Sequence, residues 1–178
     1  MSGVEENLGA AWNFNRVFEL ARGEYFKWAA HDDVHLPTFL EKTVEVLDTR
    51  PEVIWCFGRY SHIGPDGSLV PDAAERDLSF INPDGIDRSS PRPHQRFQSI
   101  LLARAGLDIY ALHRREVVAK TVVFPPYYGS EKVLLAELAM LGQYAEIPET
   151  LIHFRVHPDA SGCLPTESDL QYFIDPRD

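Results

Sequence analysis

Three neighbouring polar residues, His31, Asp32 and Asp33, follow an apolar segment and precede a predicted helix. Adjacent carboxylates supply the hard oxygen ligands that Mg²⁺ and Mn²⁺ prefer. A divalent ion bound there could neutralise diphosphate oxygens and stabilise a leaving group as charge develops on it. The same residues also fit a structural role, in which one Asp caps the helix and the other is solvated. Both interpretations stay open on these residues alone.

Two more groups of polar side chains fall near the ends of predicted elements. His153, Arg155 and His157 alternate along the last predicted strand and therefore share one of its faces. They are either ligand-binding residues or a polar row that faces solvent. Glu131 follows Ser130 in the first turn of a predicted helix. The helix dipole alone favours an acid there, so its position does not separate a reactive carboxylate from a structural one.

An alternation of helices and strands must position these side chains. The spacing of apolar residues predicts helices over 8–22, 37–49, 94–103, 114–120 and 130–141, and strands over 24–29, 53–63, 107–112 and 150–156. Helices that connect strands indicate an α/β sheet with parallel neighbours. Ligands of such sheets bind beyond the carboxyl ends of the strands, which is where residues 31–33 fall.

Two segments break this pattern. Residues 70–93 are rich in Asp, Pro, Ser and Arg without sustained periodicity, so we predict a long loop that is functional or mobile. The tail after Pro158 is polar, and we expect it to be loosely attached. The chain shows no internal repeat and no linker. Residues 1–178 therefore predict a single domain.

The composition narrows the class of protein. Hydrophobic residues make up 44% of the 178 residues and charged residues 25%, as in ordinary globular domains. A formal net charge of -10 without a basic stripe argues against nucleic-acid binding. The sequence has no stretch long and apolar enough for a transmembrane segment and no export signal in residues 1–6, so we expect a cytoplasmic protein. The three tryptophans lie on apolar faces and are assigned to the core: Trp12, Trp28 and Trp55.

Five short motifs, in this order and spacing, resemble family 2 glycosyltransferases of the GT-A type. They are NLGAAWNFNR (7–16), ARGEYF (21–26), HDD (31–33), GSE (129–131) and FRVHP (154–158). The first three resemble the family's helix, turn and metal-binding D-x-D strand end, and the last two resemble its acceptor half. The resemblance covers about residues 6–161. It implies a partial GT-A (nucleotide-diphospho-sugar transferase-like) α/β fold, a mixed sheet flanked by helices.

The resemblance implies the transfer of a sugar from a nucleotide-diphosphate sugar to an acceptor hydroxyl, with inversion and with Mg²⁺ or Mn²⁺ as cofactor. Aligned on the strand end, the D-x-D triplet falls on Ala30, His31 and Asp32, so its first Asp is absent. Asp32 matches the residue that contacts the metal. His31 and Asp33 are the neighbours that could compensate for the missing carboxylate.

The resemblance also assigns residues of the acceptor half. The family's acidic pair corresponds to Ser130 and Glu131, which makes Glu131 the candidate base that deprotonates the acceptor hydroxyl. The R-x-H-P strand end corresponds to Arg155 and His157. These two residues are expected to bind the diphosphate or to line the acceptor site.

Family members begin with a strand–helix–strand segment that holds the nucleotide, and the residues printed here start after its counterpart. We therefore expect a truncated domain in which strand 24–29 lies at or near an exposed sheet edge, with self-association through that edge. Sugar transfer by this chain alone is expected to be impaired. The alternative is a non-catalytic remnant that self-associates or binds sugar weakly. The residues do not specify the donor sugar, the acceptor or the pathway.

Overall fold

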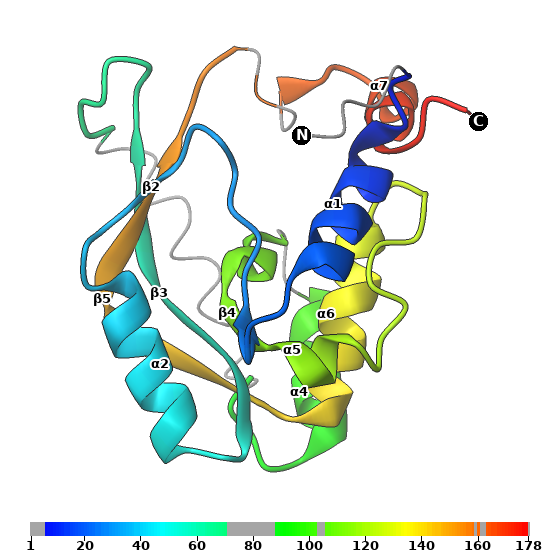
Figure 1. The fold of residues 1–178 in the computed structure, drawn as a ribbon. Helices are drawn as coiled ribbons and strands as arrows, with labels where there is room; N and C mark the ends of the chain where they lie inside the picture. Colours follow the sequence, from blue (N-terminus) through cyan, green and yellow to red (C-terminus); the bar gives the residue numbers. More distant parts are fainter. Residues whose placement is uncertain (1–5, 71–87, 103–105, 159, 161–162, 178) are drawn as a thin grey trace.

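The computed structural model describes residues 6–70, 88–102, 106–158, 160 and 163–177 (Figure 1). The helices are α1 (Gly9–Leu20), α2 (Phe39–Thr49), α4 (Pro93–Leu102), α5 (Arg115–Val118), α6 (Ser130–Leu141) and α7 (Glu167–Ile174). The strands are β1 (Tyr25–Phe26), β2 (Val34–His35), β3 (Val53–Ile63), β4 (Leu112–Arg114) and β5 (Gln143–Arg155). Among the described helices, none combines the length and the apolar character that a membrane span requires.

The strands form one mixed sheet in the order β1-β4-β3-β5-β2. The long strands β3 and β5 are parallel, whereas β1–β4, β3–β4 and β2–β5 are antiparallel. Parallel pairing thus occurs where a long helical excursion separates two neighbouring strands, as such pairing requires. The α/β class and the mixed sheet are confirmed, while the expectation of generally parallel neighbours is wrong.

Strand β1 lies at the edge of the sheet, as the sequence predicts. It is shorter than the predicted strand 24–29, because the chain leaves the sheet after Phe26. Trp28 is drawn to α1 instead, where its indole Nε1 donates a hydrogen bond to the carbonyl of Phe14 at 3.0 Å. The Trp28 ring also packs edge-on against Phe26 and Phe124. Aromatic packing on α1 therefore fixes where the segment before His31 turns.

Helices cover the sheet on two sides. Figure 1 shows α2 on one side of β3 and β5, and α1, α4, α5 and α6 on the other. Helix α2 buries Phe39 and Leu47 against the sheet, and α6 buries Leu134 and Leu138. The apolar stripes predicted from helical spacing are confirmed only in part, because Leu40 of α2, Leu101 of α4 and Leu141 of α6 are exposed. Trp28 and Trp55 lie in this core as expected, at 3% and 1% exposure.

Three predicted segments differ from the structure. Residues 107–112 form a 3-10 helix (Leu107–Tyr110) followed by β4, because buried Asp108 pairs with Arg88 and its carbonyl accepts a hydrogen bond from the amide of Ala111. Strand β5 begins at Gln143, earlier than the predicted strand 150–156. The expectation of a loosely attached tail is wrong for α7, which Thr166 caps and which packs on α1. Residues 71–87 of the predicted long loop lie outside the described residues.

The contact between Gly58 of β3 and Leu151 of β5 yields a test of the packing. A Cβ atom on Gly58 would lie 2.6 Å from Cγ of Leu151, which is 1% exposed. We expect Gly58→Ala to destabilise the protein by about 1–3 kcal/mol through overpacking. In urea unfolding, the double variant with Leu151→Ala should lose less stability than the sum of the two single variants. Strictly additive losses would contradict this contact.

Candidate functional site

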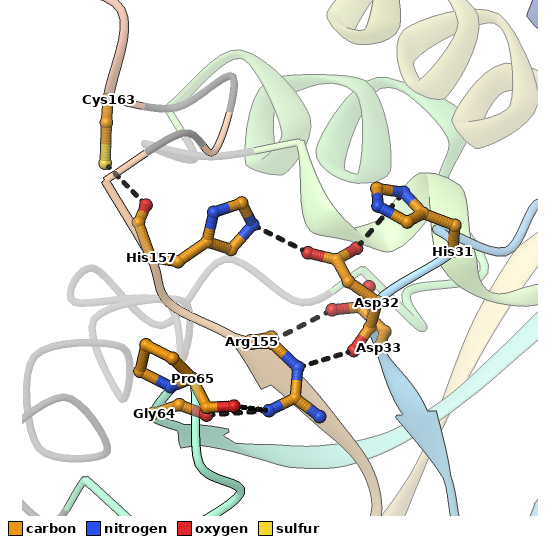
Figure 2. Close-up of polar contacts among 8 residues, drawn as sticks. All are labelled: His31, Asp32, Asp33, Gly64, Pro65, Arg155, His157 and Cys163. Atoms are coloured by element: carbon orange, nitrogen blue, oxygen red, sulfur yellow. Dashed lines mark hydrogen bonds and ion pairs between the residues drawn. The ribbon is translucent and has the colours of Figure 1, made fainter.

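Two groups of predicted site residues meet at one end of the sheet. Asp32 and Asp33, which precede β2, lie against Arg155 at the end of β5 and against His157 just beyond it (Figure 2). Strand β2 pairs with β5, so the register of that pair sets the position of the two aspartates. The structure therefore brings together residues that lie more than a hundred positions apart in the sequence.

Arg155 connects three segments of the chain at this place. Its backbone amide donates to Oδ1 of Asp33 at 3.0 Å, and its Nε donates to the carbonyl of Asp32 at 3.0 Å. Its Nη1 donates to the carbonyls of Gly64 and Pro65, at 2.7 and 3.0 Å. These partners are mostly backbone carbonyls of the loops after β1 and β3. Arg155 thus holds the loops together, and its role in diphosphate binding stays a prediction.

The Asp32 carboxylate lies between two imidazoles. Its Oδ2 is 2.9 Å from Nε2 of His157, and its Oδ1 is 3.7 Å from Nδ1 of His31. The His31 side chain is 93% exposed, whereas those of Asp32 and His157 are 21% and 22% exposed. Of the predicted site residues, His31 is therefore the one that reaches furthest into solvent.

These donors are of the kind that a divalent ion takes. A carboxylate with neighbouring imidazoles suits Mn²⁺, and Mg²⁺ is often held by one or two carboxylates together with substrate phosphates. Within the described residues, no group of three or more His, Cys, Asp and Glu side chains is placed to hold a metal ion. An ion at Asp32 would therefore need oxygen atoms from a substrate. The metal assignment of His31, Asp32 and Asp33 stays a prediction.

Asp33 has a different environment from Asp32. Its Oδ1 is already occupied by the backbone amide of Arg155. Burial raises the pKa of Asp33, and the negative charge of Asp32 raises it further, while the hydrogen bond from Arg155 and the charge of Lys27 lower it. These contacts make Asp33 an anchor between the loop and β5.

The hydroxyl of Tyr110 feels the charges of both aspartates and of the candidate base, Glu131. Burial raises the pKa of Tyr110 to about 12, and the negative charges of Asp33, Asp32 and Glu131 all raise it as well. Three negative charges thus act on the Tyr110 hydroxyl, which stays protonated at neutral pH. Tyr110 was not among the predicted site residues, because its burial near these carboxylates depends on elements far along the chain.

Glu131 lies in the first turn of α6, as predicted, and is partly buried. Gly106 allows the Glu131 side chain to pass close to the 3-10 helix, since a Cβ atom on Gly106 would lie 2.4 Å from Cγ of Glu131. A side chain at position 106 would therefore displace Glu131. Its role as a base is not tested by this packing and stays a prediction.

Lys27 is a second residue that sequence reasoning missed. Its Nζ donates to the carbonyl of Trp28 at 2.8 Å, lies 2.5 Å from Nε2 of His35, and sits 5.1 Å from the centroid of the Phe39 ring. Burial lowers its pKa to about 8, against the attraction of Asp33. Lys27 therefore places a partly desolvated positive charge within range of Asp33.

Comparison with known proteins identifies the family. Residues 4–107, more than half of the chain, match the family model described as "Glycosyl transferase family 2". The chain is a family 2 glycosyltransferase sequence. The predicted family is thereby confirmed, and with it a relationship to sugar transfer in general.

Individual relatives agree with the family and differ from this chain in length. An uncharacterized glycosyltransferase of Rickettsia felis is 32% identical over 85 residues, which are 46% of this chain and 12% of that protein. One of Rickettsia typhi is 28% identical over 83 residues, which are 45% of this chain and 23% of that protein. The family 2 chain thus spans less than a quarter of the length of these relatives.

A solved structure resembles this family 2 chain in fold. The crystal structure of S. aureus TarS superposes with a TM-score of 0.50 and 15% identity, over 82% of this chain and 24% of that one. At this identity the likeness concerns the fold alone, and it supports the GT-A type that the sequence predicts.

The lowered pKa of Lys27 predicts a pH dependence of stability. The folded protein releases this proton near pH 8, whereas the unfolded chain keeps it up to about 10.5, so the free energy of unfolding should rise between these values. Lys27→Met should remove that rise, which chemical unfolding at a series of pH values would measure. Lys120→Met, at an exposed lysine, should leave it in place. Identical pH profiles for the wild type and Lys27→Met would contradict the burial of this charge.

Proposed function

We propose that this chain provides the metal-binding and acceptor-activating part of an inverting glycosyltransferase that uses a nucleotide-diphosphate sugar. The observation that carries the proposal is the grouping of Asp32, Arg155 and His157 beyond the carboxyl ends of β3 and β5 in a family 2 chain. Ligands of α/β sheets bind at such ends of parallel strands. The order of motifs along the sequence supports the same residues.

In this proposal Asp32 holds Mg²⁺ or Mn²⁺, with His157 beside it and His31 able to approach from solvent. When bound, the ion neutralises the diphosphate oxygens and so stabilises the nucleoside diphosphate as a leaving group. In the same proposal Arg155 and His157 contact the diphosphate from this end of the sheet, in addition to their contacts with the loops and with Asp32. Asp33 and the backbone contacts of Arg155 keep the Asp32 carboxylate in place.

The acceptor is activated from a separate element. Glu131 accepts the proton of the acceptor hydroxyl, whose oxygen forms a bond to the anomeric carbon as the bond to the diphosphate breaks. Attack from the face opposite the leaving group inverts the anomeric configuration. In this proposal the protonated Tyr110 hydroxyl, whose pKa is raised by burial and by the charges of Asp33, Asp32 and Glu131, donates a hydrogen bond to a sugar oxygen.

The alternative proposal is a non-catalytic module that self-associates or binds sugar weakly. It is favoured by the edge position of β1, whose outer side pairs with no other strand in the described part of the chain. Such an edge can accept a further strand from another chain. The two proposals differ in whether donor is consumed.

Donor turnover tests the proposed function. The chain would be assayed with Mn²⁺ and UDP-, GDP- and dTDP-sugars, both alone and fused to the opening segment of a family member. The fusion should raise the rate, because that segment binds the nucleotide and so positions the donor. Glu131→Gln should lower sugar transfer roughly 100-fold or more while donor binding persists. Asp32→Asn should lower both transfer and donor binding.

The control for Glu131 is Glu116→Gln, at a first-turn glutamate of α5 that is exposed. This variant should transfer sugar at the wild-type rate. Unchanged transfer by Glu131→Gln would contradict its role as the base. Absence of turnover from every donor, with or without the fused segment, would favour the non-catalytic module.

A further inference from the structure

A cavity of about 590 Å³ lies between the first half of α1 and α7. Figure 1 shows α7 at the N-terminal end of α1. None of the residues assigned above to the metal, the diphosphate or the base is among its described lining residues. Its volume is in the range of pockets that bind small molecules.

Aromatic side chains form much of the cavity wall. Tyr172 and Phe173 of α7 line it while remaining 64% and 44% exposed, and Trp12 of α1 lines it while partly buried. The expectation that Trp12 lies in the core is therefore wrong. Flat aromatic rings left in contact with water at a cavity favour a ligand with an apolar face.

The polar side chains of the cavity indicate which polar groups a ligand would have. Asn7, Asn13 and Asp169 line the cavity and offer amide and carboxylate groups that pair with hydroxyls. Glu6 adds a second carboxylate, and none of the described lining residues is Lys, Arg or His. This charge disfavours a phosphate or a nucleotide. A neutral molecule with both C–H faces and hydroxyl groups fits best, which is the chemistry of a pyranose sugar.

The α7 wall is fastened to the segment that leads to the candidate base. The Gln171 side chain accepts a hydrogen bond from the amide of Tyr128 at 2.9 Å and donates one to the carbonyl of Pro126 at 3.3 Å. Tyr128 stands two residues before α6, whose first turn carries Glu131. Gln171 is not among the described lining residues, so these bonds connect the helix that forms one cavity wall to the loop that precedes Glu131.

We propose that the α1–α7 cavity binds the neutral carbohydrate part of the acceptor, with its C–H face on Tyr172 and its hydroxyls on Asn13 and Asp169. That the sugar is the acceptor rests on the proposed function. Binding of a sugar in this cavity does not depend on catalysis. It extends the site from the reacting groups to the part of the substrate that does not react.

The test is direct binding of neutral glycosides to the full chain, without nucleotide or metal. The probes are methyl glucoside, methyl galactoside, methyl mannoside, N-acetylglucosamine and their disaccharides, followed by ligand-observed NMR. Tyr172→Ala should raise the dissociation constant of the best probe roughly tenfold, the effect of losing one ring contact. Tyr172→Phe should bind like the wild type. Asn13→Ala, which suits a helix, should weaken binding several-fold.

Two controls keep the outcomes distinct. Tyr127→Ala removes an exposed tyrosine that does not line the cavity, and it should leave binding unchanged. Asp32→Asn and Glu131→Gln should also bind the probe normally, so a failure of sugar transfer would leave this proposal standing. Unchanged binding in both Tyr172→Ala and Asn13→Ala would overturn it. Failure of every probe to bind would overturn it as well. So would tighter binding of a nucleoside diphosphate than of any neutral glycoside in this cavity.

Discussion

The arrangement of the site depends on the contacts that Arg155 makes at the end of β5. Its amide fixes the Asp33 carboxylate, and its guanidinium fixes the carbonyls of Asp32, Gly64 and Pro65. A guanidinium offers several donors in a rigid fork, so one side chain can satisfy loops that follow two different strands. Without it, three carbonyls near the end of the sheet would lose a charged donor. The position of Asp32 follows from this junction.

The contacts of Arg155 give the two aspartates different environments. Asp33 is held by β5 and is partly desolvated, in an environment that also contains Lys27 and Tyr110. Asp32 keeps both carboxylate oxygens among imidazoles, one of them at the solvent edge. Of the two adjacent carboxylates, one is thus a structural anchor, and the other is the one that our proposal assigns to the ligand. His31, which precedes Asp32 and is exposed, could contact the same ligand from the solvent side.

Much of this could be predicted from the sequence where the signal is local. The dense β-branched and aromatic run of β3 and the leucine-rich pattern of α6 predicted elements with the observed bounds, although Ser130 does not cap α6. Strand β2 has two residues and depends on pairing with β5 far along the chain, so no local pattern predicts it. Residues 107–110 form a helical turn instead of the predicted strand, and Asp108 within that turn pairs with Arg88, twenty positions away. Lys27 and Tyr110 escaped prediction because burial by distant elements creates their properties.

The most direct test of this account is the affinity for Mn²⁺, measured by electron paramagnetic resonance in the presence of UDP, GDP or dTDP. Asp32→Asn should abolish specific Mn²⁺ binding, whereas Asp33→Asn, which keeps an oxygen for the amide of Arg155, should weaken it much less. Arg155→Met should weaken it roughly 10-fold or more, because the loop that presents Asp32 loses its support. Equal Mn²⁺ affinity in the wild type and Asp32→Asn would contradict the account.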